Sequence, residues 1–345
     1  MDIDDLIRPS LKNIQPYSSA RDEYQGNNEN MVFLDANENP FENGVNRYPD
    51  PHQRKVKALL SKLKGVSAEQ IMLGNGSDEV LDLIFRVFCE PNKDNIIILP
   101  PTYGMYAVLA NINAVAVKSV ALDSGFQPKV NDILGIADAN SKLLFLCSPN
   151  NPSGNSFESA SIEKLISGFK GIVVIDEAYI DFSKETSWIK KLQTHPNLIV
   201  TQTLSKAYGM AGIRLGICYA SKAIISVLNT IKPPYNVNEL TQQRAIVQLE
   251  QYELVQQQIN DILKERDVLI QELHKIDFVS KIYPSDANFI LARVDDANKR
   301  YNQLVEKGIV VRNRTTQPGC ENCLRFTVGA NQENEMLIHT LKLID

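Results

Sequence analysis

The chain has 345 residues, of which 43% are apolar and 22% are charged, and its formal net charge is -5. This length suffices for one large domain with a buried core and a second, smaller domain. The composition contains no basic stripe for nucleic acid, and no apolar stretch approaches the ~20 residues of a membrane span. The acidic first residues also lack the pattern of a signal peptide.

Five cysteines are scattered through the chain, and their odd number and apolar surroundings predict free thiols in a reducing cytoplasm. Cys320 and Cys323 have the spacing of a CxxC motif, but no second cysteine or histidine pair completes a zinc site. We therefore interpret this segment as a loop that leads into a strand, and we expect no metal ion.

In chain order, residues 1–30 come first. They contain Pro16, Gly26 and several asparagines, which indicates an extended arm and not a domain. We expect this arm to pack with the smaller domain.

The next part, residues 31–235, alternates short β-branched runs with amphipathic helical patterns. The predicted strands are Ile96–Leu99, Val115–Val120, Leu143–Cys147, Ile172–Ile175, Leu198–Thr201 and Ile213–Tyr219. The predicted helices are Asp78–Cys89, Tyr103–Asn111, Ser159–Gly168 and Ser221–Thr230. Continuous apolar strands between helices predict a large α/β domain, with a mostly parallel sheet covered on both faces.

The character of the chain changes after Pro233 and Pro234, and residues 236–345 predict a smaller α+β domain. Asn238–Lys275 is rich in glutamine, glutamate and leucine with almost no helix breakers, which indicates one or two long helices. The remaining predictions are the strands Val279–Tyr283, Asn288–Val294, Ile309–Arg312 and Leu324–Val328, a helix over Asp296–Lys307 and a terminal helix from Asn331.

Four polar groups lie where an open parallel sheet binds ligands, at the carboxyl ends of its strands. The first, Asn75–Glu79, precedes a helix, and its small residues suit a phosphate at the helix N-terminus. Taken alone, this segment is better explained as a plain helix cap. The second, Ser148–Gly154, has the composition of a turn. Within it, the Asn151 amide can donate a hydrogen bond to a phenolate oxygen.

The third group, Asp176–Tyr179, follows the strand that ends at Ile175. A carboxylate at this position can cap a helix, or it can pair with the protonated pyridine nitrogen of a cofactor. Tyr179, three residues on, can then reach the 3′-oxygen of the ring.

The fourth group is Ser205 and Lys206, with Arg214 in a turn rich in glycine and alanine. Lysines are usually solvated, yet Lys206 lies between two predicted strands with few other charges nearby. A lysine whose neighbours supply a hydroxyl and a guanidinium can form a Schiff base with an aldehyde cofactor while they bind its phosphate. Taken together, the four groups indicate a pyridoxal-phosphate enzyme.

Over nearly the whole chain these segments resemble the class I and II aminotransferases of pyridoxal-phosphate fold type I, and within them the histidinol-phosphate aminotransferase family. The resemblance is carried by Asp35–Pro40, Arg47–Pro51, Ser148–Gly154, Asp176–Tyr179, Thr203–Ala207 and Ala211–Gly216. It implies a mostly parallel seven-stranded sheet between helices, a smaller α+β domain and bound pyridoxal 5′-phosphate.

The resemblance also implies a role for each site residue. Lys206 would form the Schiff base and act as general base, Asp176 would pair with the pyridine nitrogen, and Tyr179 and Asn151 would bind the 3′-oxygen. The other cofactor-binding residues would be Gly76, Ser77, Asp78, Tyr103, Ser205 and Arg214, joined by Tyr48 from the second subunit of a homodimer.

On the substrate side, the family's segments resemble Pro16–Arg21, Pro101–Tyr106, Ile309–Arg312 and Cys323–Gly329. They imply that Tyr17, Tyr103, Arg312 and Arg325 bind substrate. Two arginines on adjacent strands can clamp an anion by bidentate contacts. Arg314 lies close to Arg312 and leaves the register of this pair open.

The implied reaction is a ping-pong transfer of the amino group between L-histidinol phosphate and 2-oxoglutarate in L-histidine biosynthesis. Its products are imidazole-acetol phosphate and L-glutamate. An aromatic amino acid aminotransferase and a threonine-phosphate decarboxylase of the same fold share the cofactor residues and stay open as alternatives. A cofactor-binding transcription regulator is disfavoured, because the ~30 residues before the fold are too few for a helix-turn-helix domain.

Overall fold

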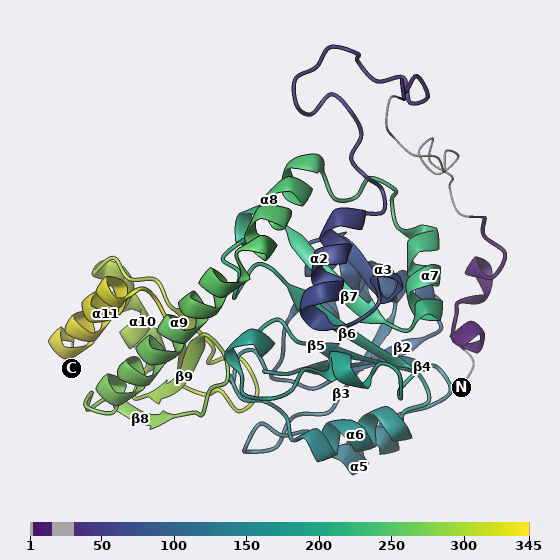
Figure 1. Cartoon of the computed structure of the whole chain (residues 1–345). Helices are drawn as coiled ribbons and strands as arrows, with labels where there is room; N and C mark the ends of the chain where they lie inside the picture. Colours follow the sequence, from purple (N-terminus) through teal and green to yellow (C-terminus); the bar gives the residue numbers. More distant parts are fainter. Residues whose placement is uncertain (1–2, 16–30, 345) are drawn as a thin grey trace.

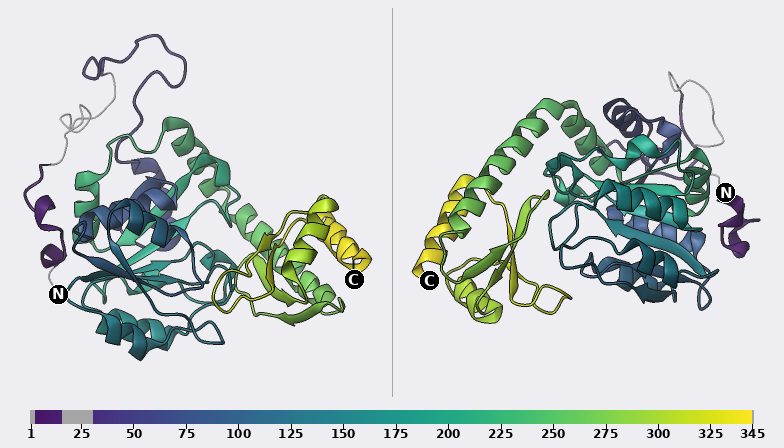
Figure 2. Two further views of the ribbon diagram at one scale, coloured as in Figure 1. Left: turned by 180° about the vertical axis from the view of Figure 1, so that it is seen from behind. Right: turned by 90° about the horizontal axis from the view of Figure 1, so that it is seen from below.

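The computed structural model describes residues 3–15 and 31–344. Two β-sheets form the centres of two lobes, and the long helix α9 (Tyr252–Leu273) runs from the larger lobe along the smaller one (Figure 1, Figure 2). No helix in these residues is long and apolar enough to cross a membrane.

The larger sheet has seven strands in the order β1-β7-β6-β5-β4-β2-β3. They are β1 (Ile71–Asn75), β2 (Asn95–Ile98), β3 (Ala116–Ser119), β4 (Ser141–Cys147), β5 (Ile172–Asp176), β6 (Leu198–Thr203) and β7 (Leu215–Ala220). Strand β7 pairs antiparallel with β1 and β6, and the other pairings are parallel. The prediction of a mostly parallel seven-stranded α/β sheet is confirmed.

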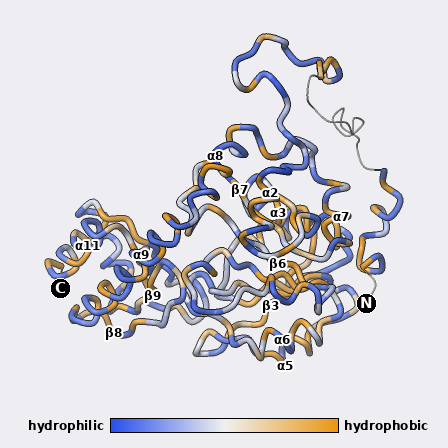
Figure 3. The backbone as a smooth tube through the Cα atoms, in the orientation of Figure 1, coloured by the Kyte–Doolittle hydropathy of each residue, from blue (hydrophilic) through white to orange (hydrophobic). Residues whose placement is uncertain are grey.

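Helices cover both faces of this sheet, because successive strand residues point to opposite sides and both sides are apolar. In β4, Leu144 and Leu146 face one buried cluster, whereas Leu143 and Phe145 face the other. Figure 3 shows the apolar residues gathered along these strands and the helices beside them. The helices of the larger lobe are α2 (Arg54–Lys64), α3 (Ser77–Phe88), α4 (Met105–Ile112), α5 (Val130–Ile136), α6 (Ser159–Gly168), α7 (Lys222–Ile231) and α8 (Glu239–Glu250).

Short 3-10 turns complete this lobe, and the two at the N-terminus correct one expectation. The turns are η1 (Ile3–Asp5), η2 (Pro9–Leu11), η3 (Ala68–Gln70), η4 (Ile180–Phe182), η5 (Trp188–Lys191) and η6 (Ala211–Ile213). Ile3 and Ile7 are buried in the cluster of α3 and α7, and the Arg8 amide donates to the Val87 carbonyl at 2.9 Å. The expected packing of the arm with the smaller domain is therefore wrong for residues 3–15.

The predicted long helical stretch forms two helices, because the chain turns at Gln251 between α8 and α9. Ala245 and Leu249 of α8 share a buried cluster with Val56 and Leu60 of α2, so α8 packs on the larger lobe. The domain boundary between residues 235 and 236 stays a prediction.

The smaller sheet has four antiparallel strands in the order β10-β11-β9-β8. They are β8 (Val279–Ile282), β9 (Phe289–Val294), β10 (Arg312–Asn313) and β11 (Cys323–Thr327), and the helices α10 (Ala297–Glu306) and α11 (Asn331–Leu343) join α9 beside them. The predicted strand Ile309–Arg312 is wrong in its extent. The Ile309 amide bonds to the Leu304 carbonyl at the end of α10, so strand pairing begins only at Arg312.

The two faces of the smaller sheet have different partners. Ile290 and Phe326 pack into a cluster with α9, α10 and α11. Phe289 and Leu291, on the opposite face, belong to the buried cluster of the larger sheet. This second face is therefore directed toward the larger lobe.

Candidate active site

The strand register brings three of the four polar groups to one edge of the larger sheet. Cys147 at the end of β4 pairs with Asp176, and Asp176 at the end of β5 pairs with Thr201 of β6. The loops that follow β4 and β6 therefore begin on either side of Asp176. Those loops carry Asn151 and Lys206.

The Asp176 carboxylate is buried and has one oxygen without a partner. Its Oδ2 accepts a hydrogen bond of 2.7 Å from the Tyr106 hydroxyl, whereas its buried Oδ1 has no hydrogen-bond partner within residues 3–15 and 31–344. Burial raises the pKa of Asp176, and the hydrogen bond from Tyr106 opposes this shift. A buried carboxylate with one unsatisfied oxygen fits a cationic N–H donor, such as a protonated ring nitrogen.

Tyr106 was not among the predicted site residues. It is fully buried in α4, and its ring stacks on Phe145 with centroids 4.7 Å apart. The sequence contained a signal, because Tyr106 follows Tyr103 by three residues, one helical turn. Tyr103 contacts Tyr106 edge to face at 5.6 Å and donates a hydrogen bond of 3.0 Å to Asp78.

The remaining polar group lies at the N-terminus of α3. There Gly76 and Gly216 allow the backbone of Ser77 and the side chain of Arg214 to approach closely, and we call this arrangement the glycine cradle. The Gly76 amide donates to the Arg214 carbonyl at 2.9 Å, and a Cβ added at Gly76 would lie 2.6 Å from the Arg214 Nη2 atom. A Cβ at Gly216 would lie 2.3 Å from the Ser77 nitrogen. Backbone amides and a guanidinium that meet without side chains between them fit a phosphate group.

Ser205 and Lys206 follow β6 beside this cradle. The Thr203 hydroxyl donates to the Ser205 hydroxyl at 3.0 Å and so fixes its position. The Lys206 Nζ atom lies 5.8 Å from the centroid of the Tyr179 ring. Lys206 as a whole residue is exposed to solvent, but its amine is partly desolvated by neighbouring groups, and this lowers its pKa. The positive charge of Arg325 lowers the pKa of Lys206 further. A lowered pKa increases the neutral amine fraction, which is the nucleophilic form.

Tyr179 and Arg325 connect the two sheets at this site. The buried Tyr179 ring contacts Phe289 of β9 edge to face at 5.1 Å. Arg325 of β11 lies 5.0 Å from the Phe289 ring centroid, and its Nη1 donates to Asn151 Oδ1. The Nδ2 group of Asn151 is thus the donor end left for a ligand.

The structure resolves the register of the arginines. Arg312 and Arg325 are direct cross-strand partners, so their side chains lie on the same face of the smaller sheet. Arg312 is exposed and Arg325 is half-buried, and burial lowers the pKa of Arg325 to about 10, with neighbouring arginines adding to the shift. This register allows both guanidinium groups to approach one anion, and their role as a substrate clamp stays a prediction.

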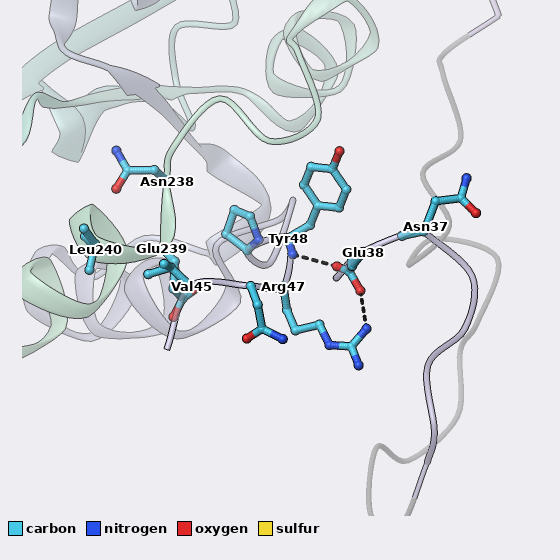
Figure 4. A pocket seen from close by; sticks show the side chains of 11 residues that line it. Asn37, Glu38, Val45, Arg47, Tyr48, Asn238, Glu239 and Leu240 are labelled. Carbon is cyan, nitrogen blue, oxygen red and sulfur yellow. Dashed lines mark hydrogen bonds and ion pairs between the residues drawn. The ribbon is translucent and has the colours of Figure 1, made fainter. Parts of the chain in front are cut away.

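Tyr48 lies apart from this cluster within one chain. Its side chain is 51% exposed and stacks on Tyr235 with ring centroids 4.4 Å apart. The Glu38 carboxylate accepts from the Tyr48 amide at 2.7 Å and from Arg47 at 2.8 Å (Figure 4). Glu38, Arg47 and Tyr48 line an open cavity of about 440 Å³. Asn238, Glu239 and Leu240 at the start of α8 line it too. None of the lining residues belongs to the Lys206 cluster.

Two further predictions concern Tyr17 and the cysteines Cys320 and Cys323. Tyr17, with Arg21, lies outside the described residues, so its substrate role stays a prediction. Cys320 and Cys323 are buried and free. Within residues 3–15 and 31–344, no cluster of His, Cys, Asp or Glu could hold a metal ion.

Comparison with known proteins adds a family to this geometry. The pattern of the family "Aminotransferase class I and II" matches residues 23–343. The chain is 64% identical over 345 residues to a protein of Flavobacterium johnsoniae named "Histidinol-phosphate aminotransferase", covering 100% of this chain and 99% of that relative.

Two solved structures of proteins with the same name share the fold. The first, from Clostridium acetobutylicum, has a TM-score of 0.80 at 26% identity and covers 87% of this chain and 91% of its own. The second, from Sinorhizobium meliloti, was solved in complex with pyridoxal-5′-phosphate. Its TM-score is 0.79 at 21% identity, with 87% of this chain and 84% of its own covered.

Proposed function

The chain belongs to the class I and II aminotransferase family, and on that premise we propose that it transfers an amino group between L-histidinol phosphate and 2-oxoglutarate. The products are imidazole-acetol phosphate and L-glutamate, so the enzyme acts in L-histidine biosynthesis. The observation that carries the proposal is the meeting of Lys206, the unsatisfied Asp176 oxygen and Arg325 at one sheet edge, in a chain similar over its whole length to named relatives.

Pyridoxal 5′-phosphate is the proposed cofactor, and the residues of the site fit it. When bound, it supplies an aldehyde that condenses with amines and a ring that takes up the electron pair from the substrate Cα. Gly76, Ser77, Ser205 and Arg214 bind the phosphate in the glycine cradle. The unpartnered Asp176 Oδ1 would pair with the ring nitrogen, while Asn151 Nδ2 and the Tyr179 hydroxyl would donate to the 3′-oxygen.

Lys206 has two tasks in this proposal. Its neutral amine would attach the cofactor, and the lowered pKa of Lys206 increases the fraction of that form. When it is not attached to the cofactor, the Lys206 amine would act as general base, removing a proton from the substrate Cα and returning it to the cofactor carbon that carries the amino group. Asp176 keeps a proton on the ring nitrogen throughout, because its carboxylate is the counter-charge for that cation.

Arg312 and Arg325 bind the anionic end of each substrate. Two guanidinium groups on one sheet face can take the phosphate of histidinol phosphate and later a carboxylate of 2-oxoglutarate. One anion subsite used in turn by both substrates suits a ping-pong reaction. Tyr103, which donates a hydrogen bond to Asp78, would lie beside the ring and the substrate.

We also propose a homodimer, in which the partner subunit's Tyr48 completes the phosphate site. The segment that carries Tyr48 exposes large apolar side chains, with Leu34 86% exposed and Phe41 79% exposed. Apolar surface of this kind favours contact with a second copy. The free cysteines and the biosynthetic reaction favour a reducing cytoplasm.

A panel of half-reactions tests the substrate. The holoenzyme is mixed with one amino compound at a time, and the visible absorption of the lysine-bound cofactor is followed together with release of carbon dioxide. Histidinol phosphate and glutamate are expected to bleach the band without gas release. Bleaching by phenylalanine or tyrosine in place of histidinol phosphate would support the aromatic alternative. Carbon dioxide from threonine phosphate would support the decarboxylase.

A further inference from the structure

A third arginine lies on the arginine-bearing face of the smaller sheet. The Arg314 amide donates to the Cys323 carbonyl at 2.8 Å, which extends the pairing that begins with Arg312 and Arg325. Side chains two positions apart on a strand point to the same face. Arg314 therefore lies on the same face of the sheet as Arg312 and Arg325, two residues beyond Arg312.

That face is directed at the active site. Phe289, which contacts both Arg325 and Tyr179, lies on it in β9. The positive charge of Arg314 opposes the rise that burial causes in the pKa of Tyr179. It also adds to the fall that burial causes in the pKa of Arg325. Arg314 is thus close enough to influence residues that contact the proposed cofactor and substrate.

The Arg314 guanidinium has no counter-charge in the part of the chain that the structure describes. Its Nε atom is buried without a hydrogen-bond partner, and so is the Nε atom of Arg325. No Asp or Glu of these residues forms an ion pair with Arg312, Arg314 or Arg325. Arg314 and Arg325 thus each have a buried N–H group without a partner, Arg312 lies beside them, and an anion between the three side chains would satisfy these donors and offset their mutual repulsion.

The number of arginines at this subsite indicates which kind of anion it binds. A carboxylate carries one negative charge, whereas a phosphate monoester carries close to two at neutral pH. Arginines recognise phosphate oxygens through pairs of planar N–H donors. A third arginine adds more to the binding of the doubly charged group than to that of a carboxylate.

We propose that Arg314 is the third cation of the substrate anion subsite and that it favours a phosphate monoester over a carboxylate. This inference rests on the proposed function, because the subsite is that of the amino donor. Arg312 and Arg325 clamp the anion of either substrate, and Arg314 distinguishes the two.

The test uses the holoenzyme with Arg314→Gln, which removes the charge, and Arg314→Lys, which retains it. The Kd of inorganic phosphate is measured by calorimetry with the cofactor bound. We expect it to weaken by about 10- to 100-fold in Arg314→Gln, as for loss of a charged hydrogen bond, and by less in Arg314→Lys. The kcat/KM for histidinol phosphate should fall by a similar factor through KM, while the glutamate half-reaction changes by less than about threefold.

Arg293→Gln is the matched control. Arg293 lies in β9 of the same sheet, and its Nε is likewise buried without a partner among the described residues, but its guanidinium pairs with Glu321 at 3.6 Å, so its loss should leave the Kd of inorganic phosphate unchanged. Phosphate affinity in Arg314→Gln equal to that of the wild type would overturn the inference, as would an equal loss for histidinol phosphate and glutamate. If the wild type does not react with histidinol phosphate but Arg314→Gln still loses affinity for inorganic phosphate, the proposed function is refuted. The anion subsite is then still supported.

Discussion

At the scale of single residues, Asp176 shows how burial creates a site. Its Oδ2 accepts a hydrogen bond from the Tyr106 hydroxyl, and its Oδ1 is buried with no hydrogen-bond partner among the described residues that meets ordinary distance and angle limits. An unsatisfied buried oxygen destabilises the protein unless a ligand supplies the missing donor. Asp176 and Tyr106 therefore act as one unit, in which the tyrosine fixes the orientation of the carboxylate.

Replacement of Tyr106 by phenylalanine tests this unit. A hydrogen bond to a charged group contributes about 1.5–3 kcal/mol, so its loss raises the pKa of Asp176 further and weakens the counter-charge for the ring nitrogen. We expect kcat to fall by about tenfold with little change in KM, and the Kd of the cofactor to rise. Tyr219→Phe is the control, since the Tyr219 hydroxyl is buried without a partner. Equal kinetics and cofactor affinity in the wild type and Tyr106→Phe would contradict this role.

The pKa of Lys206 gives a prediction about pH. Burial lowers it first, and the positive charge of Arg325 lowers it further because that charge disfavours the protonated amine. Arg325→Gln removes this repulsion, so the pKa of Lys206 should rise. The pH midpoint for attachment of the cofactor to cofactor-free protein should then move upward. Arg325→Lys keeps a charge and should leave the midpoint nearer that of the wild type. A midpoint that moves downward in Arg325→Gln is incompatible with this account.

At the scale of elements, the strand ends that carry the site were predictable, whereas strand β1 and helix α2 were not. The apolar runs of β4, β5 and β6 are continuous, so Asn151, Asp176 and Lys206 could be placed at one edge from the sequence. Strand β1 was missed because Gly74 interrupts its apolar run after three residues. Helix α2 was also missed, although Val56, Leu60 and Leu63 form an apolar stripe in its sequence.

The contact between β7 and the start of α3 leads to a prediction at this scale. A Cβ at Gly216 would lie 2.3 Å from the Ser77 nitrogen and 2.4 Å from the Gly76 carbonyl carbon, and neither backbone atom can move without changing the cradle. We expect Gly216→Ala to destabilise the fold by about 1–3 kcal/mol and to weaken cofactor binding more than tenfold (on the order of overpacking effects). Gly212→Ala is the control, because no atom lies within 4 Å of its added Cβ. Cofactor affinity equal in the two variants would show that the cradle is not a binding element.

At the scale of the whole molecule, the site is divided between two lobes. The contact between Arg325 and Asn151 joins residues 174 positions apart, so no local pattern in the sequence predicts it. The register of Arg312 with Arg325, and the position of Arg314 beside them, likewise required the paired strands. The cofactor half of the site was predictable from strand ends, whereas the substrate half depends on how the two sheets meet.

Tyr48 adds a prediction about the assembly. It is exposed and separate from the Lys206 cluster of its own chain, so its proposed contact with the cofactor phosphate requires a second subunit. Light scattering should give the mass of a dimer, and Tyr48→Phe should weaken cofactor binding by about tenfold without changing that mass. Tyr252→Phe, at another partly exposed tyrosine outside the site, is the matched control. A monomer that binds the cofactor with full affinity would contradict the shared site.

The most direct test of the central claim is the stoichiometry of complete turnover. Purified enzyme with bound cofactor is given L-histidinol phosphate and 2-oxoglutarate, and both products are followed by nuclear magnetic resonance in the wild type and in Lys206→Ala. We predict that L-glutamate and imidazole-acetol phosphate form in equal amounts with the wild type, and that Lys206→Ala forms neither at a comparable rate. Unchanged turnover in Lys206→Ala, or a wild type that forms no imidazole-acetol phosphate, would contradict the account.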